Sequence, residues 1–184
     1  METAAEAVHR LFFALWPDRS LRAAAEEVAA RVAAEQCPVA RAVRAERYHL
    51  TLQFLGDFQP PSSALIEAAM SAAGCVPAKA FDLTLNWIDR FPGSRVGWLG
   101  TDASPPQLLA LHEALERALA AQGVDVAIDQ KFTPHVTILR DVSTLTPRPV
   151  SPITWSVDAF VLIDSRPGTP APYRILGQWP LMRR

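Results

Sequence analysis

Short apolar runs alternate with amphipathic stretches along the chain. Leu11 to Trp16 is an unbroken apolar and aromatic run that stops at Pro17, which is the pattern of a buried strand. From residue 20 to residue 35, apolar residues recur every three or four positions, which predicts a helix with one buried face. Phe81 to Trp87 alternates apolar and polar side chains, as a half-buried strand does. The pattern therefore predicts strands packed against helices.

The same criteria locate the remaining elements. Strands are predicted at 10–16, 49–56, 81–87, 95–100, 132–139, 154–163 and 173–181; helices at 20–35, 62–73 and 107–122; and a proline-broken loop at 143–152. Helices and strands do not alternate strictly, which favours an α+β fold with antiparallel sheets.

One short pattern occurs twice. His49-Leu-Thr-Leu and His135-Val-Thr-Ile each place a threonine two residues after a histidine. Residues i and i+2 of a strand share a face, so each histidine projects beside its own threonine while the apolar residues point into a core. Elsewhere, His9 and His112 lack such a partner, and we interpret them as structural.

The order of elements also repeats. Each half has a strand, a helix, a His-x-Thr strand and then an alternating strand. We therefore predict a single bilobal domain, 1–184, formed by an internal duplication with approximate repeats at 8–90 and 94–184. Two antiparallel sheets are expected to face a central cleft, with the helices packed outside.

Composition narrows the class of protein. A net charge of −1 excludes a wholly basic surface of the kind that coats nucleic acid, although a local basic cleft remains possible. The chain has no apolar run of the roughly 20 residues that span a bilayer, and its start does not fit a signal peptide, so we expect a cytoplasmic protein. Cys37 and Cys75 have no CxxC partner and are expected to be ordinary semi-buried residues.

Two histidines with two threonines suit chemistry at phosphorus. Imidazole has an ordinary pKa of about 6.5, so one histidine can act as base while the other acts as acid. Threonine hydroxyls can donate hydrogen bonds to the anionic oxygens. A zinc site would need a third ligand that neither strand supplies, and GxSxG and glycine-rich phosphate loops are absent from the sequence. We therefore expect neither a metal nor another cofactor.

The two motifs and their flanks resemble a known family. His49-Leu-Thr-Leu-Gln-Phe-Leu-Gly and Phe132-Thr-Pro-His-Val-Thr-Ile-Leu-Arg140 look like the paired HxTx motifs of the two-histidine phosphoesterase superfamily, and within it the RNA 2′,3′-cyclic phosphodiesterases once described as 2′-5′ RNA ligases. The likeness extends to Arg10-Leu-Phe-Phe-Ala-Leu, Arg95-Val-Gly-Trp-Leu-Gly and the closing stretch from Tyr173 to Leu181.

The resemblance implies hydrolysis of a 2′,3′-cyclic phosphate to a 2′-phosphomonoester. By motif, His49 is the proton donor to the departing 3′ oxygen and His135 is the proton acceptor that activates water. Thr51 and Thr137 would hold the phosphate oxygens. Arg140 matches an arginine of the second motif and would add positive charge near the phosphate.

Further candidates follow from strand parity and from proximity. Gln53 shares the predicted face of His49 and Thr51, so it is the pocket candidate on that strand, whereas Phe54 is expected in the core. Tyr173 and Trp98 are candidates for base stacking, with core packing as the alternative. The basic residues that flank the motifs and could meet RNA are Arg44, Arg47 and Lys131.

Two other functions remain open. The same site could join RNA halves through a 2′-5′ bond or open a small cyclic nucleotide. Alternatively, the protein could be a non-catalytic module that binds RNA ends, although a binder would not need two proton-transfer groups. In each case the expected partner is RNA with a 2′,3′-cyclic phosphate end or a small cyclic nucleotide, with no membrane, and the protein is expected to be a monomer.

Overall fold

The computed structural model describes residues 8–126 and 132–183, which form one antiparallel sheet and three helices. The strands are β1 His9–Leu15, β2 Arg41–Ala42, β3 Leu50–Phe58, β4 Phe81–Phe91, β5 Val96–Gly100, β6 His135–Arg140, β7 Arg148–Val157, β8 Ala159–Ser165 and β9 Tyr173–Pro180. The helices are α1 Arg19–Gln36, α2 Ser63–Gly74 and α3 Pro106–Ala121, with a short 3₁₀ turn at Ala45–Arg47. The α+β class with an antiparallel sheet is thus confirmed.

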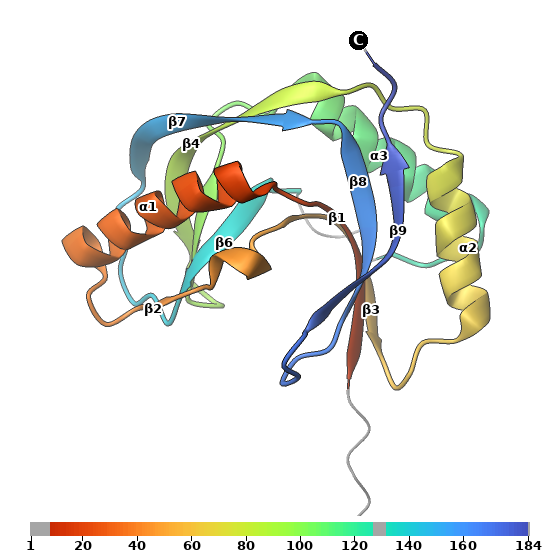
Figure 1. The fold of residues 1–184 in the computed structure, drawn as a ribbon, viewed down its shortest axis with the longest axis horizontal. Helices are drawn as coiled ribbons and strands as arrows, with labels where there is room; N and C mark the ends of the chain where they lie inside the picture. Colours follow the sequence, from red (N-terminus) through yellow and green to blue (C-terminus); the bar gives the residue numbers. More distant parts are fainter. Residues whose placement is uncertain (1–7, 127–131, 184) are drawn as a thin grey trace, which may run out of the picture.

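The sheet is continuous. Its strand order is β7-β4-β5-β6-β3-β1-β8-β9, with β2 added to β6 (Figure 1). Four strands lie on each side of the β3–β6 junction, where Leu50 opposite Val136 is the paired position. The prediction of two separate sheets is therefore wrong, because the two strands that carry the motifs pair with each other and join the halves.

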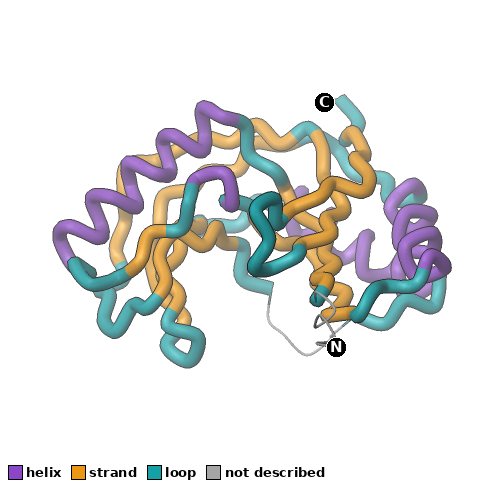
Figure 2. Tube along the Cα trace, turned by 60° about the horizontal axis from the view of Figure 1, so that its bottom comes forward, coloured by secondary structure: helices purple, strands orange, loops and turns teal. Residues whose placement is uncertain are grey.

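The two halves of the sequence exchange elements. β4 belongs to the first half of the chain, yet it pairs with β5 and β7 of the second half. Likewise, β8 of the second half pairs with β1 of the first half. Helix α1 packs against β6 and β7, whereas α3 packs against β3, and α1 and α2 lie toward opposite ends of the molecule (Figures 1 and 2). Each half of the sheet is consequently built from both halves of the chain.

Strand β1 shows how the sheet separates the core from the opposite face. Leu11, Phe13 and Leu15 are fully buried in the main core. Phe12 and Ala14 point the other way and form a second, smaller apolar cluster with Val161, Ile163, Trp16 and Tyr173. The alternation of a strand therefore places Phe12 and its aromatic neighbours Trp16 and Tyr173 on the second face of the sheet.

Residues 143–165 differ from the prediction. The expected loop at 143–152 and strand at 154–163 are instead two strands, β7 and β8, that meet at Asp158. Pro149 and Pro152 lie within β7, which is an edge strand. A proline cannot donate a hydrogen bond to a neighbouring strand, but on an edge strand that donor can face away from the sheet.

Three further predictions concern single residues and the membrane. Cys37 is buried and Cys75 is exposed, and both thiols are free. His9 holds the buried carboxylate of Asp164, with Nδ1 2.9 Å from Oδ1, in keeping with a structural role. None of the helices in the described ranges is long and apolar enough to cross a membrane.

Candidate active site

The two His-x-Thr motifs lie side by side at the junction of the sheet halves. Leu50 of β3 pairs with Val136 of β6, and both are fully buried. In an antiparallel pair with this register, His49 lies opposite Thr137 and Thr51 lies opposite His135. These four side chains share the face away from Leu50 and Val136. Each histidine is thereby set beside the threonine of the other motif as well as its own, in a nearly two-fold arrangement.

Both imidazoles are fixed in the same tautomer. His49 Nδ1 lies 2.7 Å from the carbonyl oxygen of Arg47, and His135 Nδ1 lies 2.7 Å from that of Thr133. A carbonyl oxygen can only accept, so Nδ1 carries the proton and donates in both residues. The reactive nitrogen of each ring is therefore Nε2. The same local bond, to the carbonyl two residues earlier, orients both histidines.

Burial disfavours the charged form of each histidine. The pKa of His49 is lowered to about 4, mainly by desolvation and also by the positive charges of His135, Arg22 and Arg140, against the Arg47 carbonyl, which raises it. Desolvation also lowers the pKa of His135, again opposed by its carbonyl partner, Thr133. Both rings are thus neutral at pH 7 in the free protein. His135 contributes to the lowered pKa of His49, in keeping with its place on the neighbouring strand.

An aromatic cluster surrounds His49. Its ring stacks on Phe12 at 4.9 Å and on Trp16 at 6.2 Å between centroids, and Tyr173 meets it edge-on at 5.6 Å. Tyr173 is half-buried, and burial raises the pKa of its hydroxyl. The sequence placed Tyr173 near the site but gave no reason to include Phe12 or Trp16. Their role depends on Phe12 lying on the open face of β1, which the unbroken apolar run did not reveal.

Arginines add positive charge on the same side. Arg22 lies over the Trp16 ring at 4.6 Å, and its Nε–H donates to the Pro17 carbonyl at 2.9 Å. Arg140 ends β6, is exposed and forms no ion pair within the described part of the chain. Arg10 and Arg47 also act on the Tyr173 hydroxyl. Arg22 was not among the site candidates from the sequence, because helical periodicity does not place it on the buried face of the helix.

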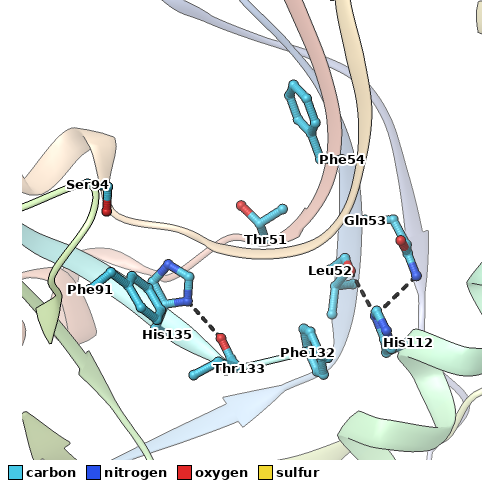
Figure 3. A pocket seen from close by; sticks show the side chains of 10 residues that line it. All are labelled: Thr51, Leu52, Gln53, Phe54, Phe91, Ser94, His112, Phe132, Thr133 and His135. Atoms are coloured by element: carbon cyan, nitrogen blue, oxygen red, sulfur yellow. Dashed lines mark hydrogen bonds between the residues drawn. The ribbon is translucent and has the colours of Figure 1, made fainter. Parts of the chain in front are cut away.

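His135 faces a cavity of about 410 Å³ (Figure 3). Phe91 meets its ring edge-on at 4.8 Å, and Trp98 lies 6.1 Å away and is 7% exposed, which identifies Trp98 as core packing beneath the site. The residues that line the cavity are Thr51, Leu52, Gln53, Phe54, Phe91, Ser94, His112, Phe132, Thr133 and His135.

Two bulges change which residues of β3 face this cavity. Phe12 pairs with Phe54 and Ala14 with Thr51, so β3 has one residue more than β1 between these positions. Thr51 and Phe54 consequently project from one side of the strand and Gln53 from the other (Figure 3). The prediction that Phe54 lies in the core is wrong, since it is 46% exposed, while Gln53 is 7% exposed.

His112 links the two motifs. Its Nδ1–H donates to the Leu52 carbonyl at 2.8 Å, and Gln53 Nε2 lies 3.2 Å from the same nitrogen. Its ring stacks on Phe132 at 4.0 Å with an interplanar angle of 5°. From the sequence, His112 was interpreted only as structural. Its position directly after Leu111, on the border of the buried leucine stripe, is the signal that could have indicated an inward side chain.

The remaining candidates are placed as follows. Thr51 and Thr137 are both half-buried on the site face. Arg44, which precedes the 3₁₀ turn before His49, and Arg47, which ends it, are both exposed. Lys131 lies outside the described residues. Among the residues that are described, no group of three or more His, Cys, Asp or Glu side chains is arranged to hold a metal ion.

Paired His-x-Thr motifs on adjacent strands, each with its histidine Nδ1 held by a backbone carbonyl, are typical of the two-histidine phosphoesterases. The 2′-5′ RNA ligase superfamily model matches residues 17–169, and the chain belongs to that family. It is 37% identical over 160 residues to the RNA 2′,3′-cyclic phosphodiesterase of Escherichia coli, covering 85% of this chain and 86% of that protein.

Solved structures share the fold of this chain. The structure of E. coli LigT complexed with 3′-AMP matches with a TM-score of 0.78 and 31% identity, over 95% of this chain and 98% of that one. The protein TT0787 of Thermus thermophilus shares the fold with a TM-score of 0.76 at 24% identity, over 95% of this chain and 99% of that one.

Proposed function

We propose that the protein hydrolyses the 2′,3′-cyclic phosphate at RNA ends to a 2′-phosphomonoester, using side chains alone. The observation that carries the proposal is the pair of histidines with matched Nδ1–carbonyl bonds, each beside a threonine, on adjacent strands. The relatives named RNA 2′,3′-cyclic phosphodiesterase support the choice of substrate.

The reaction follows as one in-line displacement. His135 Nε2 takes a proton from water, the water oxygen attacks phosphorus, and the bond from phosphorus to O3′ breaks. His49 gives its Nε2 proton to the departing O3′, which leaves the phosphate on O2′. Thr51 and Thr137 donate hydrogen bonds to the two non-bridging oxygens, whose charge grows in the transition state. The near symmetry of the site suits the same groups to the reverse reaction.

The donor role requires a substrate-induced change at His49. With a pKa of about 4, its ring is almost wholly neutral at pH 7 in the free protein. A bound phosphate monoanion favours the charged imidazolium and raises this pKa. The anion also offsets the repulsion that Arg22 and Arg140 exert on His49. Substrate binding therefore charges the acid that the reaction needs.

The base of the terminal nucleotide is assigned to the His49 side. Phe12, Trp16 and Tyr173 supply aromatic surface there, and the arginines that act on His49 and Tyr173 supply charge for phosphates. A small cyclic nucleotide presents the same phosphate and base. Gln53 lines the cavity on the His135 side and is a candidate substrate contact there.

The proposal includes an internal duplication. The first repeat would contain β1, β3, β4 and α1, and the second would contain the corresponding β5, β6, β8 and α3. Each repeat contributes one strand and one helix that pack against strands of the other repeat. This correspondence supports a single bilobal domain with repeats near 8–90 and 94–184. The monomeric state and cytoplasmic location stay predictions.

An RNA oligonucleotide ending in a 2′,3′-cyclic phosphate tests the function directly. In the presence of EDTA, the protein is expected to convert it to the 2′-phosphate product, resolved from the 3′-phosphate by chromatography. His9→Gln removes a histidine outside the site and serves as the matched control for His49→Ala and His135→Ala. A 3′-phosphate product, or no product, would contradict the proposal.

A further inference from the structure

The ring of His49 is oriented by a short turn that lies outside the sheet. His49 stands one residue before β3, and its Nδ1–H donates to the carbonyl of Arg47, the last residue of the 3₁₀ turn Ala45–Arg47. This turn is the short coil between β2 and β3 in Figure 1. A single 3₁₀ turn has poorer hydrogen-bond geometry than an α-helix and depends on its surroundings for stability. The direction of the imidazole therefore depends on what holds the turn in place.

Arg22 holds the turn against the end of β1. It lies near the start of α1 and is half-buried. Its Nε–H donates to the carbonyl of Pro17 at 2.9 Å, just after β1, and its Nη1–H donates to the carbonyl of Ala45, at the start of the 3₁₀ turn. The guanidinium is planar and its donors have a fixed geometry, so these two bonds set the position of the turn relative to β1. Arg22 thereby connects α1 and the end of β1 to the segment that leads into His49.

The same guanidinium supports an aromatic ring beside His49. It lies over the Trp16 ring at 4.6 Å from the centroid, and the Trp16 ring stacks with that of His49 at 6.2 Å. A guanidinium within about 6 Å of an indole is attracted to its π face. Two groups that hold the imidazole, the Arg47 carbonyl and the Trp16 ring, are therefore both connected to Arg22.

The hydrogen-bond acceptors of Arg22 are neutral carbonyls, so they do not compensate its charge. In the described ranges, 8–126 and 132–183, Arg22 forms no ion pair. The carboxylates of Glu46 and Asp18 act on it without such a contact. Its positive charge in turn acts on His49. A substitution that keeps this charge and one that removes it therefore test different parts of the role of Arg22.

We propose that Arg22 is a positioning residue for His49. By fixing the Ala45 carbonyl and the Trp16 ring, it keeps the Arg47 carbonyl aligned with Nδ1 and directs Nε2 to the substrate. The inference rests on the proposed function, in which His49 protonates the departing O3′. Without Arg22 the bond from Nδ1–H to the Arg47 carbonyl is no longer enforced, and part of the population adopts the other neutral tautomer, with the proton on Nε2. The position and the tautomer of the ring change together.

Arg22→Lys and Arg22→Met separate the guanidinium geometry from the charge. Lysine keeps the charge but lacks the planar fork, and methionine keeps neither. Hydrolysis of the cyclic-phosphate oligonucleotide should lose about 10- to 100-fold in kcat in both variants, the scale of loss from displacing a catalytic group by roughly 1 Å, with a smaller change in KM. Arg31→Met, at an exposed arginine of the same helix, is the matched control and should keep the wild-type kcat. Circular dichroism verifies folding, and Arg22→Lys alone decides the outcome where Arg22→Met does not fold.

The ¹⁵N chemical shifts of the imidazoles report the tautomer of each histidine at pH 7, with the signals assigned by His49→Gln. The wild type and Arg31→Met should show the Nδ1–H form at both His49 and His135. Both Arg22 variants should show a mixture of tautomers at His49 alone. His135 is held by the Thr133 carbonyl and serves as an internal control. This measurement needs no turnover, so it tests the positioning role separately from the proposed function.

A wild-type kcat in Arg22→Lys would overturn the inference and leave the proposed function intact. An unchanged His49 tautomer in a variant that has lost activity would do the same, as would a change of tautomer at both histidines, which indicates a general loosening of the site. Failure of the wild-type protein to hydrolyse the oligonucleotide would instead reject the proposed function.

Discussion

His49 is held neutral in the free protein by the surroundings that also suit it to an anionic substrate. Its ring lies among Phe12, Trp16 and Tyr173, and two arginines oppose its protonation. An imidazole in these surroundings is protonated mainly when a phosphate group binds beside it, because the anion stabilises the imidazolium. His49 is therefore an acid that becomes charged when an anion binds, and it is not charged in the free protein.

A titration of the histidine rings by NMR measures this property. The pKa of His49 is expected at about 4 in the free protein, below the ordinary value because burial and positive neighbours disfavour the imidazolium. Addition of the product nucleoside 2′-phosphate should raise it toward neutrality, since the anion stabilises the charged ring. The signals are assigned with His49→Gln. A free-protein pKa near the ordinary value that does not move on adding the nucleotide would contradict this account.

At the scale of elements, the strands that support the two motifs control the geometry of the site. Gly100 of β5 pairs with His135, and a Cβ at Gly100 would come within 2.7 Å of the Pro134 carbonyl oxygen and 2.8 Å of the Trp98 ring. Contacts that short force the backbone before His135 or the Trp98 ring to shift. The absence of a side chain at Gly100 thus lets β5 and β6 approach and holds His135 in register.

Gly100→Ala is expected to lower kcat by about 10- to 100-fold, the scale of loss from displacing a catalytic group by roughly 1 Å. Steady-state hydrolysis of the cyclic phosphate measures it. Gly93→Ala is the matched control, because a Cβ at Gly93, in the turn between β4 and β5, meets nothing within 4 Å. Equal rates in the two variants would show that the β5–β6 spacing does not position His135.

The sequence predicted those features that leave a local pattern in the chain, and it missed those that depend on distant contacts. The His-x-Thr repeat, the class of fold and the helices follow from local periodicity, and the structure agrees. The exposure of Phe54 could not be predicted, because the bulge at Leu52 shifts its parity relative to Thr51 and no glycine or proline stands next to that bulge. Pro149 and Pro152 suggested a loop because nothing local indicates an edge strand.

At the scale of the whole molecule, the site exists only where the two halves of the chain interlock. The pairing of Leu50 with Val136 joins β3 to β6, and β4 and α1 complete the half of the sheet that carries His135. A single continuous sheet was not predictable from the repeat, because pairing between distant strands leaves no mark on either sequence. The repeated order of elements is consequently visible in the sequence, while the exchange of strands is not.

The interlocked halves should unfold together. Separate expression of residues 1–93 and 94–184 is expected to give two chains without a cooperative thermal transition. Each fragment lacks the strands of the other half with which its own strands pair. The intact protein should show one transition by circular dichroism and by tryptophan fluorescence at the same temperature. A folded fragment, or two resolved transitions in the intact protein, would mean that the repeats are independent units.

The central claim is that His49 and His135 act as a pair in one step of phosphate-ester hydrolysis. The most direct measurement is the single-turnover rate on the cyclic-phosphate oligonucleotide for His49→Ala, His135→Ala and the double variant, with folding verified by circular dichroism. Each single variant should be slower by on the order of 10²–10⁴-fold. The double variant should be hardly slower than either, as for residues that act as a unit. A single variant with the wild-type rate, or losses that multiply in the double variant, would contradict the claim.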